Sequence, residues 1–309
     1  MKKILTIITL LIINIHMPTF AQIYTIGSYN IRADIPQDAK SGNAWKDRYN
    51  ALCNLISFND FDIFGTQEDP LNQIRDIQTK LSDTYNYTGI ARDDGISKGE
   101  LCAIFYKKET FDLIASCTFW LSETPEKISK GWDAKGPRIC TFARLKDKKN
   151  GSIFSIFNLH IDHLGIKART NSCKLVIEKI NKLCQKNDTI ILVGDFNFTE
   201  ISANFQILVN SKYFKDCYKH AKRKWIPTGS CCGFTPNNIS KHSLDHILVS
   251  KNTEVNKFGV LNNFYFTVGK NYISEITQTD KMDLKNEVIE IHNPSDHYPI
   301  CAEITIRCN

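Results

Sequence analysis

Apolar and polar residues alternate along the first part of the chain with two different periods. Short apolar runs predict β-strands at Ile23–Tyr29 and Asp62–Thr66. Apolar residues at helical spacing predict amphipathic helices over Asp47–Ser57 and Leu71–Leu81. This alternation of strand and helix indicates α/β architecture.

The pattern changes between Leu101 and Phe157, where strands follow one another without helices between them. Polar or glycine-containing turns, such as residues 147–151, separate these strands. Such a succession favours antiparallel pairing. The predicted strands are Leu101–Tyr106, Phe111–Trp120, Arg138–Leu145 and Ser152–Asn158.

The second half of the chain returns to alternating helices and strands. Apolar residues between Cys173 and Cys184 recur at helical spacing and predict a long helix that covers a sheet. Thr189–Val193 is predicted to be a buried strand, and Tyr298–Ile306 the last strand. Residues 251–293 are more polar, and we expect long loops or an insertion there. No linker or repeat interrupts the chain, so one α/β sandwich domain over residues 22–309 fits best.

The first 21 residues have the order of a secretory signal peptide. Two lysines precede an apolar run over Ile4–Ile13, and small residues end the segment at Ala21. A membrane anchor is the alternative, but the run is shorter than the roughly 20 residues of a spanning helix, and His16 and Pro18 break the apolar character soon after it. We therefore expect cleavage before Gln22 and export to the periplasm or the exterior.

The charge of the chain permits an anionic substrate without requiring nucleic acid. The formal net charge of +6 includes two lysines of the predicted signal peptide, so the mature chain carries +6 − 2 = +4.

The eleven cysteines are an odd number without a repeating spacing, and no close pairing of Cys or His indicates zinc. Core packing is expected for Cys102, Cys140 and Cys301, while disulfides are left open for Cys217, Cys231, Cys232 and Cys308.

Several predicted strands end in carboxylates, amides or histidines. Because side chains alternate faces along a strand, Asn30 should project with Arg32, His160 with Asp162, and Asp195 with Asn197. Oxygen donors of this kind suit a hard cation such as Mg²⁺, which also binds substrate phosphate. The segments concerned are residues 28–32, 66–68, 158–162, 194–197 and 295–297.

At these segments the chain resembles the endonuclease/exonuclease/phosphatase superfamily, which includes pancreatic deoxyribonuclease, abasic-site endonucleases, bacterial sphingomyelinases, inositol-phosphate phosphatases and deadenylases. The resemblance runs from about Ile23 to Ile306, with five motifs in the family's order. Residues 98–100, 120–125 and 131–133 also look like a branch of secreted bacterial members. The resemblance implies a four-layer α/β sandwich of two mixed, largely antiparallel sheets flanked by helices. We also expect a monomer without an obligate protein partner.

The resemblance implies that Glu68 is the principal ligand of a divalent cation, with Asn30 and Asp296 holding the same ion. Mg²⁺ is the expected ion, with Mn²⁺ or Ca²⁺ as alternatives, and a count of one or two ions is left open. The other interpretation of Glu68 is an acid that caps the helix after Asp69-Pro70.

Four further residues match the family's water- and phosphate-handling positions. Asp195 and Asn197 would contact the attacking water and the scissile phosphate. His297 would act as general base or phosphate clamp, oriented by Asp245. The alternative interpretation of both acidic motifs is an ordinary turn at a strand end.

His160 and Glu100 resemble the family's second histidine–carboxylate pair, near the phosphate or the leaving group. The alternative for His160 is a histidine of the core. Arg32 is expected to contact a phosphate oxygen. Further candidates, each of which could equally be a structural ion pair, are Asp162, Arg138 and Arg169.

The implied reaction is in-line attack of water on phosphorus, without a covalent intermediate, in a phosphodiester or a phosphomonoester. The alternatives are an inactive relative that binds a phosphorylated ligand or partner, and a calcium-stabilised binding protein. The substrate is left open between nucleic acid, a phospholipid headgroup and a sugar or inositol phosphate. A basic stretch beside Trp225 could follow a nucleic-acid backbone, although a solvated loop is the favoured interpretation; its residues are Lys219, Lys222, Arg223 and Lys224. The apolar segment Asn263–Phe266 could dock on a membrane, or it is a strand.

Overall fold

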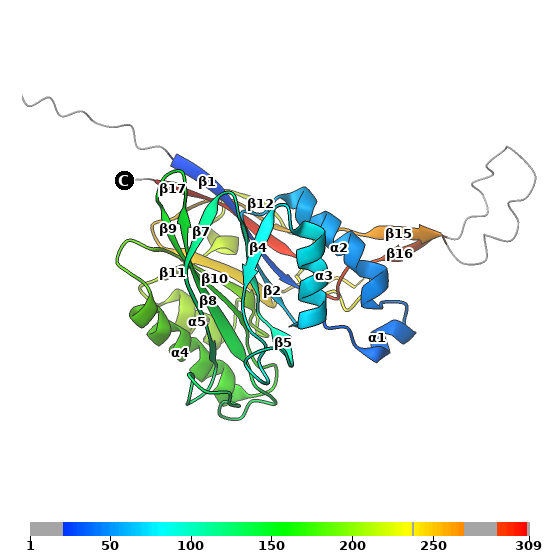
Figure 1. The fold of residues 1–309 in the computed structure, drawn as a ribbon, viewed down its shortest axis with the longest axis horizontal. Helices are drawn as coiled ribbons and strands as arrows, with labels where there is room; N and C mark the ends of the chain where they lie inside the picture. The colour runs from blue at the N-terminus through cyan, green and yellow to red at the C-terminus, as the bar shows by residue number, and fades with distance from the viewer. Residues whose placement is uncertain (1–20, 237, 269–288, 308–309) are drawn as a thin grey trace, which may run out of the picture.

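The computed structural model of the chain describes residues 21–236, 238–268 and 289–307. Two large sheets dominate it (Figure 1). The first sheet has, in spatial order, β12 (Arg223–Trp225), β14 (Glu254–Val260), β17 (Ile300–Arg307), β1 (Ala21–Asn30), β2 (Ile63–Gln67), β6 (Ile104–Lys107) and β4 (Tyr85–Thr88). The second has β11 (Phe214–Asp216), β13 (Asp245–Ser250), β10 (Thr189–Asp195), β9 (Ile153–His160), β8 (Ile139–Asp147) and β7 (Phe111–Trp120).

Two small sheets and the helices complete the described fold. The small sheets pair β3 (Asp69–Pro70) with β5 (Glu100–Leu101), and β15 (Tyr265–Val268) with β16 (Ile289–His292). The helices are α1 (Pro36–Lys40), α2 (Trp45–Asn59), α3 (Leu71–Leu81), α4 (Ile166–Leu183), α5 (Ala203–Val209) and α6 (Cys217–His220). In Figure 1, α2 and α3 lie on one side of the sandwich, and α4 and α5 lie on the other.

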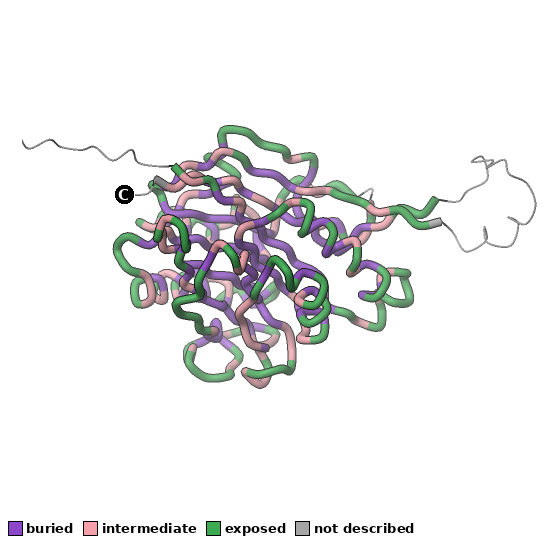
Figure 2. The backbone as a smooth tube through the Cα atoms, turned by 45° about the horizontal axis from the view of Figure 1, so that its top comes forward, coloured by how far each residue is buried: buried purple, intermediate pink, exposed green. Residues whose placement is uncertain are grey.

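The core has three apolar layers, and these confirm the four-layer sandwich. Residues of both sheets, among them Ile26 and Ile191, meet in the central layer. A second layer joins the outer face of the second sheet to α4 and α5, where Val176 is fully buried. A third joins the first sheet to α2 and α3 through Leu52 and Ile74. Figure 2 shows the buried residues gathered in the interior of the molecule. Each fully buried aliphatic side chain contributes about 1.5–3 kcal/mol there.

Most strand pairs are antiparallel, and the parallel ones lie at the centre of each sheet and at one edge. In the first sheet β1 runs parallel to β2, with Asn30 opposite Gln67. In the second sheet β10 runs parallel to β9 and antiparallel to β13, so that Asp195 lies opposite both His160 and Asp245. The edge strand β12 is parallel to β14. The register alone therefore brings chemically active residues to one end of the sandwich.

One predicted strand is wrong in its extent. The stretch Leu101–Tyr106 is divided between β5 and β6, and the backbone between them leaves the ladder. Ala103 N donates to the side chain of Asp69, at 3.2 Å from Oδ2. Ala103 O accepts both from the backbone N of Thr66 at 2.9 Å and from Asn158 Nδ2 at 2.8 Å. The predicted helix Leu71–Leu81 has the observed bounds of α3.

The polar region 251–293 is less irregular than expected. It contains β14, whose Val255, Phe258 and Val260 are buried in the first sheet, so the prediction of loops is wrong there. The apolar segment Asn263–Phe266 leads into strand β15, and Phe264 packs against Tyr298 with ring centroids 6.2 Å apart. Residues 269–288 lie outside the described part of the chain.

All cysteines of the described residues are free thiols. Cys102 and Cys140 are buried as predicted, and Cys301 is half-buried against the core. Cys217 and Cys232 are buried as well, although their sequence surroundings are polar. Cys308 and residues 1–20 of the predicted signal peptide fall outside the described residues. Among the residues that are described, no helix is long and apolar enough to cross a membrane.

Candidate active site

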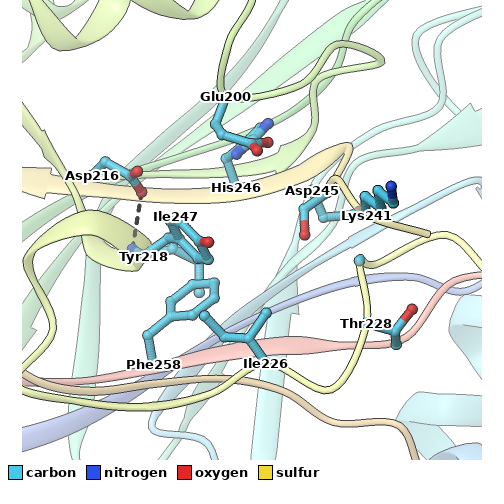
Figure 3. Close-up of a pocket in the computed structure, with 12 residues that line it drawn as sticks. Glu200, Asp216, Tyr218, Ile226, Thr228, Lys241, Asp245, His246, Ile247 and Phe258 are labelled. Atoms are coloured by element: carbon cyan, nitrogen blue, oxygen red, sulfur yellow. Dashed lines mark hydrogen bonds between the residues drawn. The ribbon is translucent and has the colours of Figure 1, made fainter. Parts of the chain in front are cut away.

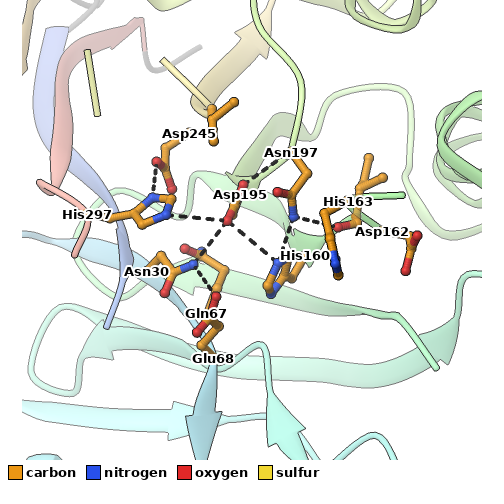
Figure 4. Close-up of polar contacts among 12 residues, drawn as sticks. Asn30, Gln67, Glu68, His160, Asp162, His163, Asp195, Asn197, Asp245 and His297 are labelled. Atoms are coloured by element: carbon orange, nitrogen blue, oxygen red, sulfur yellow. Dashed lines mark hydrogen bonds and ion pairs between the residues drawn. The ribbon is translucent and has the colours of Figure 1, made fainter. Parts of the chain in front are cut away.

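The strand ends of both sheets bring the predicted site residues together (Figure 4). Asn30 ends β1, and its Nδ2 donates to Glu68 Oε1 and to Asp195 Oδ2, both at 3.0 Å. Asp195 ends β10 in the opposite sheet. The segment of Asp296 and His297 is held to β1 by Ser295, whose Oγ donates to Asn30 O at 2.7 Å. Residues more than 250 positions apart in sequence thus form one polar cluster.

A buried amide network joins the two sheets beneath this cluster. Asn158 on β9 donates from Nδ2 to Thr66 O at 2.7 Å and to Ala103 O at 2.8 Å, and its Oδ1 accepts from Gln67 Nε2 at 2.7 Å. The approach requires glycine at position 65, because a Cβ there would lie 2.6 Å from Asn158 Cγ. The sequence analysis did not single out these amides, which fix Gln67 and therefore the backbone that carries Glu68.

Three residues that follow strand ends have left-handed backbone conformations. The φ angles are 58° at Arg32, 59° at Glu68 and 53° at Asn197. For residues with a side chain such conformations cost about 1–3 kcal/mol each and gather at functional sites. They also end the strand alternation, so the expectation that Arg32 shares a strand face with Asn30, and Asn197 with Asp195, is wrong. The two residues meet in another way, because Arg32 N donates to Asn30 Oδ1 at 3.0 Å.

Glu68 faces the cluster instead of capping α3. Its Oε2 accepts from Ala33 N at 3.4 Å, and the N-cap position of α3 is Pro70. The capping interpretation is therefore wrong. Arg32 lies between two carboxylates, with Nη1 at 3.8 Å from Glu68 Oε2 and 3.5 Å from Asp296 Oδ2. Asp38 anchors the guanidinium at 2.8 Å, and this hydrogen bond raises the pKa of Arg32.

The donor set fits a hard divalent cation. Glu68, His160 and Asp195 have ligand atoms within 4.8 Å of one another, and so do Asp195, Asp245 and His297. Burial, together with the charge of Glu68, raises the pKa of Asp296, which means that the carboxylates are crowded and poorly solvated. A bound cation would relieve this repulsion. Carboxylate and amide oxygens are also the ligands that Mg²⁺ prefers.

Asp245 and His297 form a buried pair. His297 Nδ1 donates to Asp245 Oδ2 at 2.7 Å, and the two side chains are 7% and 1% exposed. Burial opposes the charged imidazole, but the charge and hydrogen bond of Asp245 outweigh it, and the pKa of His297 is raised well above its usual value. His297 Nε2 lies 4.0 Å from Asp195 Oδ2. Burial, with the charge of Asp245 next, raises the pKa of Asp195 to about 7.

His160 is a neutral imidazole held by Asn197. Asn197 Nδ2 donates to His160 Nε2 and to Ile161 O, both at 2.9 Å, while Asn197 N donates to Asp195 Oδ1 at 2.9 Å. Burial and then the charge of Arg138 lower the pKa of His160 well below its usual value. His160 also lies 3.6 Å from Asp195 Oδ2, so it belongs to the cluster and is not only a residue of the core.

Glu100 does not pair with His160, which corrects the sequence-based prediction. Arg92 donates to both of its oxygens, from Nη1 at 2.7 Å and from Nη2 at 2.9 Å. The planar guanidinium satisfies a carboxylate through two parallel hydrogen bonds, and this explains the different partner. His160 Nδ1 has no hydrogen-bond partner among the described residues.

The further candidates are mainly structural. Asp162 Oδ1 accepts from Leu164 N at 3.0 Å and Gly165 N at 2.7 Å, and Asp162 lies 3.4 Å from Arg138 Nε. It therefore holds a turn and an ion pair, and the expectation that it shares a strand face with His160 is wrong. Arg169 reaches the backbone of Asn197, with Nη1 to O at 3.5 Å.

Arg48 is a site-supporting residue that the sequence analysis missed. Its side chain is 1% exposed and donates to Ile31 O and Arg32 O, both at 2.6 Å, and to Pro294 O at 3.1 Å. It thereby ties the turn after β1 to the turn before Asp296. The available signal was an arginine in the first turn of the predicted amphipathic helix, on the side that packs inward.

A cavity of about 20 Å³ lies next to Asp245 and is not the phosphate site (Figure 3). Side chains of both polar and apolar character line it, including Asp216, Ile226 and Phe258. This volume is enough for about one water molecule. A sugar phosphate or a nucleotide is far larger, so the cavity has no part in substrate binding.

Comparisons with known proteins agree with this geometry. The family model described as "Endonuclease/Exonuclease/phosphatase family" matches residues 27–297. An endonuclease/exonuclease/phosphatase family protein from Bacteroides thetaiotaomicron is 38% identical, with a TM-score of 0.86 over 94% of this chain and 100% of that one. The mannosyl-6-phosphatase of the same organism is 38% identical, with a TM-score of 0.84 over 92% of this chain and 100% of that one.

A viral relative matches over a shorter stretch. An uncharacterized protein of Acanthamoeba polyphaga mimivirus is 29% identical over 175 residues, which are 55% of this chain and 65% of the viral protein. The family assignment rests on the longer matches and on the gathered site residues. The chain therefore belongs to the endonuclease/exonuclease/phosphatase family and is a phosphoric ester hydrolase that depends on a divalent cation.

Proposed function

We propose that the chain is an exported phosphomonoesterase that releases phosphate from a hexose 6-phosphate or a glycan that carries one, with Mg²⁺ as the cation. The observation that carries the proposal is the likeness to a mannosyl-6-phosphatase at 38% identity over the whole of that chain. The site supports it, because every group that water activation and phosphate binding require is present in one buried cluster.

The proposed reaction is in-line attack of water on phosphorus, in which Asp195 accepts the proton of the water. A pKa of about 7 suits a general base at neutral pH. Asn197 and Asn30 fix this carboxylate through Oδ1 and Oδ2, so it is oriented before the substrate binds. A cation held by Glu68, Asp296 and Asn30 would supply positive charge to the phosphate and the leaving oxygen.

The two histidines have different proposed roles because their charges differ. His297, protonated beside Asp245, offers Nε2 to a phosphate oxygen and neutralises part of its charge. His160 is neutral, and its Nε2 already accepts from Asn197, so it positions that amide and does not carry charge. Of the two histidines, only His297 then acts on the phosphate electrostatically.

The location of the basic stretch argues against a nucleic-acid substrate. The strand register relates the basic stretch to β1. Arg223 on β12 pairs with Lys257 on β14, Lys257 pairs with Glu303 on β17, and Glu303 pairs with Thr25 on β1. Thr25 precedes Asn30 by five residues, or roughly 17 Å of strand, and β12 is three strands away from β1. The basic stretch therefore lies outside the catalytic cluster and is not part of the phosphate site.

The proposal is tested with the chain from Gln22 onward and a substrate panel: mannose and glucose 6-phosphates, inositol phosphates, nucleotides, DNA, RNA and sphingomyelin. We expect phosphate release to be fastest from the hexose 6-phosphates and to be absent in Asp195→Ala. Preference for a diester would reject the proposal. Binding of these esters without turnover, with Mg²⁺ or Mn²⁺ present, would favour the alternative of an inactive relative.

A further inference from the structure

We propose that Arg92 and Glu100 form the subsite that binds the hydroxyl groups of the leaving group. This inference rests on the proposed function, since it assigns the recognition of the sugar to a particular pair of side chains. The pair lies outside the phosphate-handling cluster, and neither its guanidinium nor its carboxylate has a part in the reaction described above.

The two small strands place Glu100 beside the metal-binding carboxylate. In the β3–β5 sheet Glu100 lies opposite Pro70, two residues after Glu68. Figure 1 shows β5 close to the end of β2, the strand that leads into Glu68. Burial raises the pKa of Glu100, the charge of Arg92 opposes this, and the charge of Glu68 adds to it. Glu100 is therefore a near neighbour of the reaction centre.

The geometry of in-line displacement directs the leaving group toward this side. Asp195, which handles the water, belongs to the second sheet, whereas Glu68 follows a strand of the first sheet. Asn30 Nδ2 lies between them, 3.0 Å from each carboxylate. The leaving oxygen departs opposite the attacking water, so it moves away from Asp195 and toward the first-sheet side. The rest of the leaving group then reaches β5.

The pair is built rigidly and still reaches solvent. Two hydrogen bonds of 2.7 and 2.9 Å lock the guanidinium to the carboxylate, and the side chains are 21% and 23% exposed. The backbone is fixed as well, because Arg92 N donates to Glu100 O at 3.1 Å and Trp120 Nε1 donates to Arg92 O at 2.8 Å. Glu100 thus presents its carboxylate in one orientation.

The chemistry of such a pair suits a polyol. A carboxylate has about four lone-pair positions, and two are used by Arg92, so the others can accept hydroxyl groups. A guanidinium can donate to the oxygen of the same or the next hydroxyl. A sugar presents adjacent hydroxyls that both donate and accept, whereas an aryl leaving group presents none. The pair would therefore separate sugar phosphates from phosphate esters without hydroxyls.

The test compares two esters in the same enzyme. The ratio of kcat/KM for mannose 6-phosphate to kcat/KM for phenyl phosphate is measured at saturating Mg²⁺ in the wild type, in Glu100→Gln and in Arg92→Lys. Both substitutions preserve size, and thermal melting shows whether each variant is folded. The control is Lys257→Gln, which removes an exposed pair with Glu303 on the distant part of the first sheet. We expect the ratio to fall by about 10- to 100-fold in both site variants and to stay at the wild-type value in the control.

The losses on the two esters show whether the Arg92–Glu100 pair contacts the leaving group, as proposed. Equal losses on the two esters would overturn it, because the pair would then act on the phosphate and not on the leaving group. A wild-type enzyme without preference for hydroxylated leaving groups would overturn it too. If the wild type prefers a nucleotide or an inositol phosphate to hexose 6-phosphates, the proposed function fails. The subsite is still supported in that case if the variants lose the same preference relative to phenyl phosphate.

Discussion

Asp245 Oδ2 lies 2.7 Å from His297 Nδ1 in the interior of the site. The negative charge of Asp245 raises the pKa of His297 and also that of Asp195. The proposed reaction needs His297 protonated and Asp195 ionised. Asp245 thus moves both limits of the active pH range in the same direction.

Replacement of Asp245 by Asn should shift the whole activity profile toward acid. Without the charge, Asp195 ionises at lower pH, so the acid limb moves down, and His297 loses its proton at lower pH, so the alkaline limb moves down as well. We also expect kcat to fall on the order of 10²-fold. The measurement is kcat against pH at saturating Mg²⁺ in both proteins. A loss of rate with both limbs unmoved would contradict this role of Asp245.

Chelation should abolish turnover, and the addition of Mg²⁺ should restore it. Because a ligand that binds only the folded state stabilises it, Mg²⁺ should also raise the melting temperature. Glu68→Gln removes a charge from the donor set, so this shift should become small and the Mg²⁺ concentration needed for turnover should rise by at least about tenfold. Differential scanning calorimetry gives the shift independently of activity. Full turnover in the chelated protein would rule out the cation in the reaction.

Asn158→Leu should destabilise the fold by about 2–4 kcal/mol. The substitution removes the three hydrogen bonds that Asn158 makes with Thr66 O, Ala103 O and Gln67 Nε2, and each is worth about 0.5–1.5 kcal/mol. Ala103 O still accepts from Thr66 N at 2.9 Å, and Gln67 Nε2 still donates to Ser28 Oγ at 3.3 Å. Urea unfolding measures the loss. Asn256→Leu is the matched control. Within the described part of the chain the half-buried amide of Asn256 bonds to the Thr305 hydroxyl alone, so its loss should cost less than about 1 kcal/mol. Similar losses in the two variants would show that the inter-sheet network is not a special source of stability.

Export predicts a defined N-terminus. The chain expressed with residues 1–21 in a bacterium should appear outside the cytoplasm and begin at Gln22, because the segment has the charge, apolar run and small-residue end of a cleaved signal. Mass spectrometry of the purified protein gives the first residue. Lys2→Glu and Lys3→Glu together should slow export, while the same change at Lys40 and Lys46 should not. A retained N-terminus in the membrane fraction would favour the anchor.

Local patterns predicted the strands, the helices and the polar residues at the strand ends, whereas the four layers and the roles of the site residues were expected from the resemblance to the family. Asn30, Glu68, Asp195 and His297 directly follow or end apolar runs, and strand ends of a sandwich meet. The sequence did not predict the left-handed turns at Arg32 and Glu68, since alternation holds only while the strand continues.

Side-chain contacts that form only in the packed fold account for the remaining differences. Glu100 was expected beside His160, but Arg92, only eight residues away, provides the better geometric match to its two oxygens. Asn158 acts through partners 91 and 92 residues away, and no periodicity marks such a network. These interactions depend on the packing of the two sheets, which a pattern of apolar residues determines only in outline.

Arg48 links the stability of the fold to the position of the metal-site residues. Its guanidinium donates to Ile31 O, Arg32 O and Pro294 O, so it holds the turns that carry Arg32 and Asp296. Arg48→Met removes these three hydrogen bonds, although Arg32 O still accepts from Gln73 Nε2 at 3.0 Å. We expect the free energy of unfolding to fall by about 3 kcal/mol and the Mg²⁺ requirement to rise, because the turn before Asp296 loses this anchor.

The comparison is Arg75→Met on α3, where the side chain is exposed, and this variant should differ from the wild type by less than about 0.5 kcal/mol. Urea unfolding and Mg²⁺ titration of activity are measured on both variants. If Arg48→Met loses stability while its Mg²⁺ requirement stays at the wild-type value, the arginine supports the fold alone, and Asp296 must owe its position to Ser295 and to the backbone hydrogen bond that its O accepts from Cys232 N at 2.7 Å.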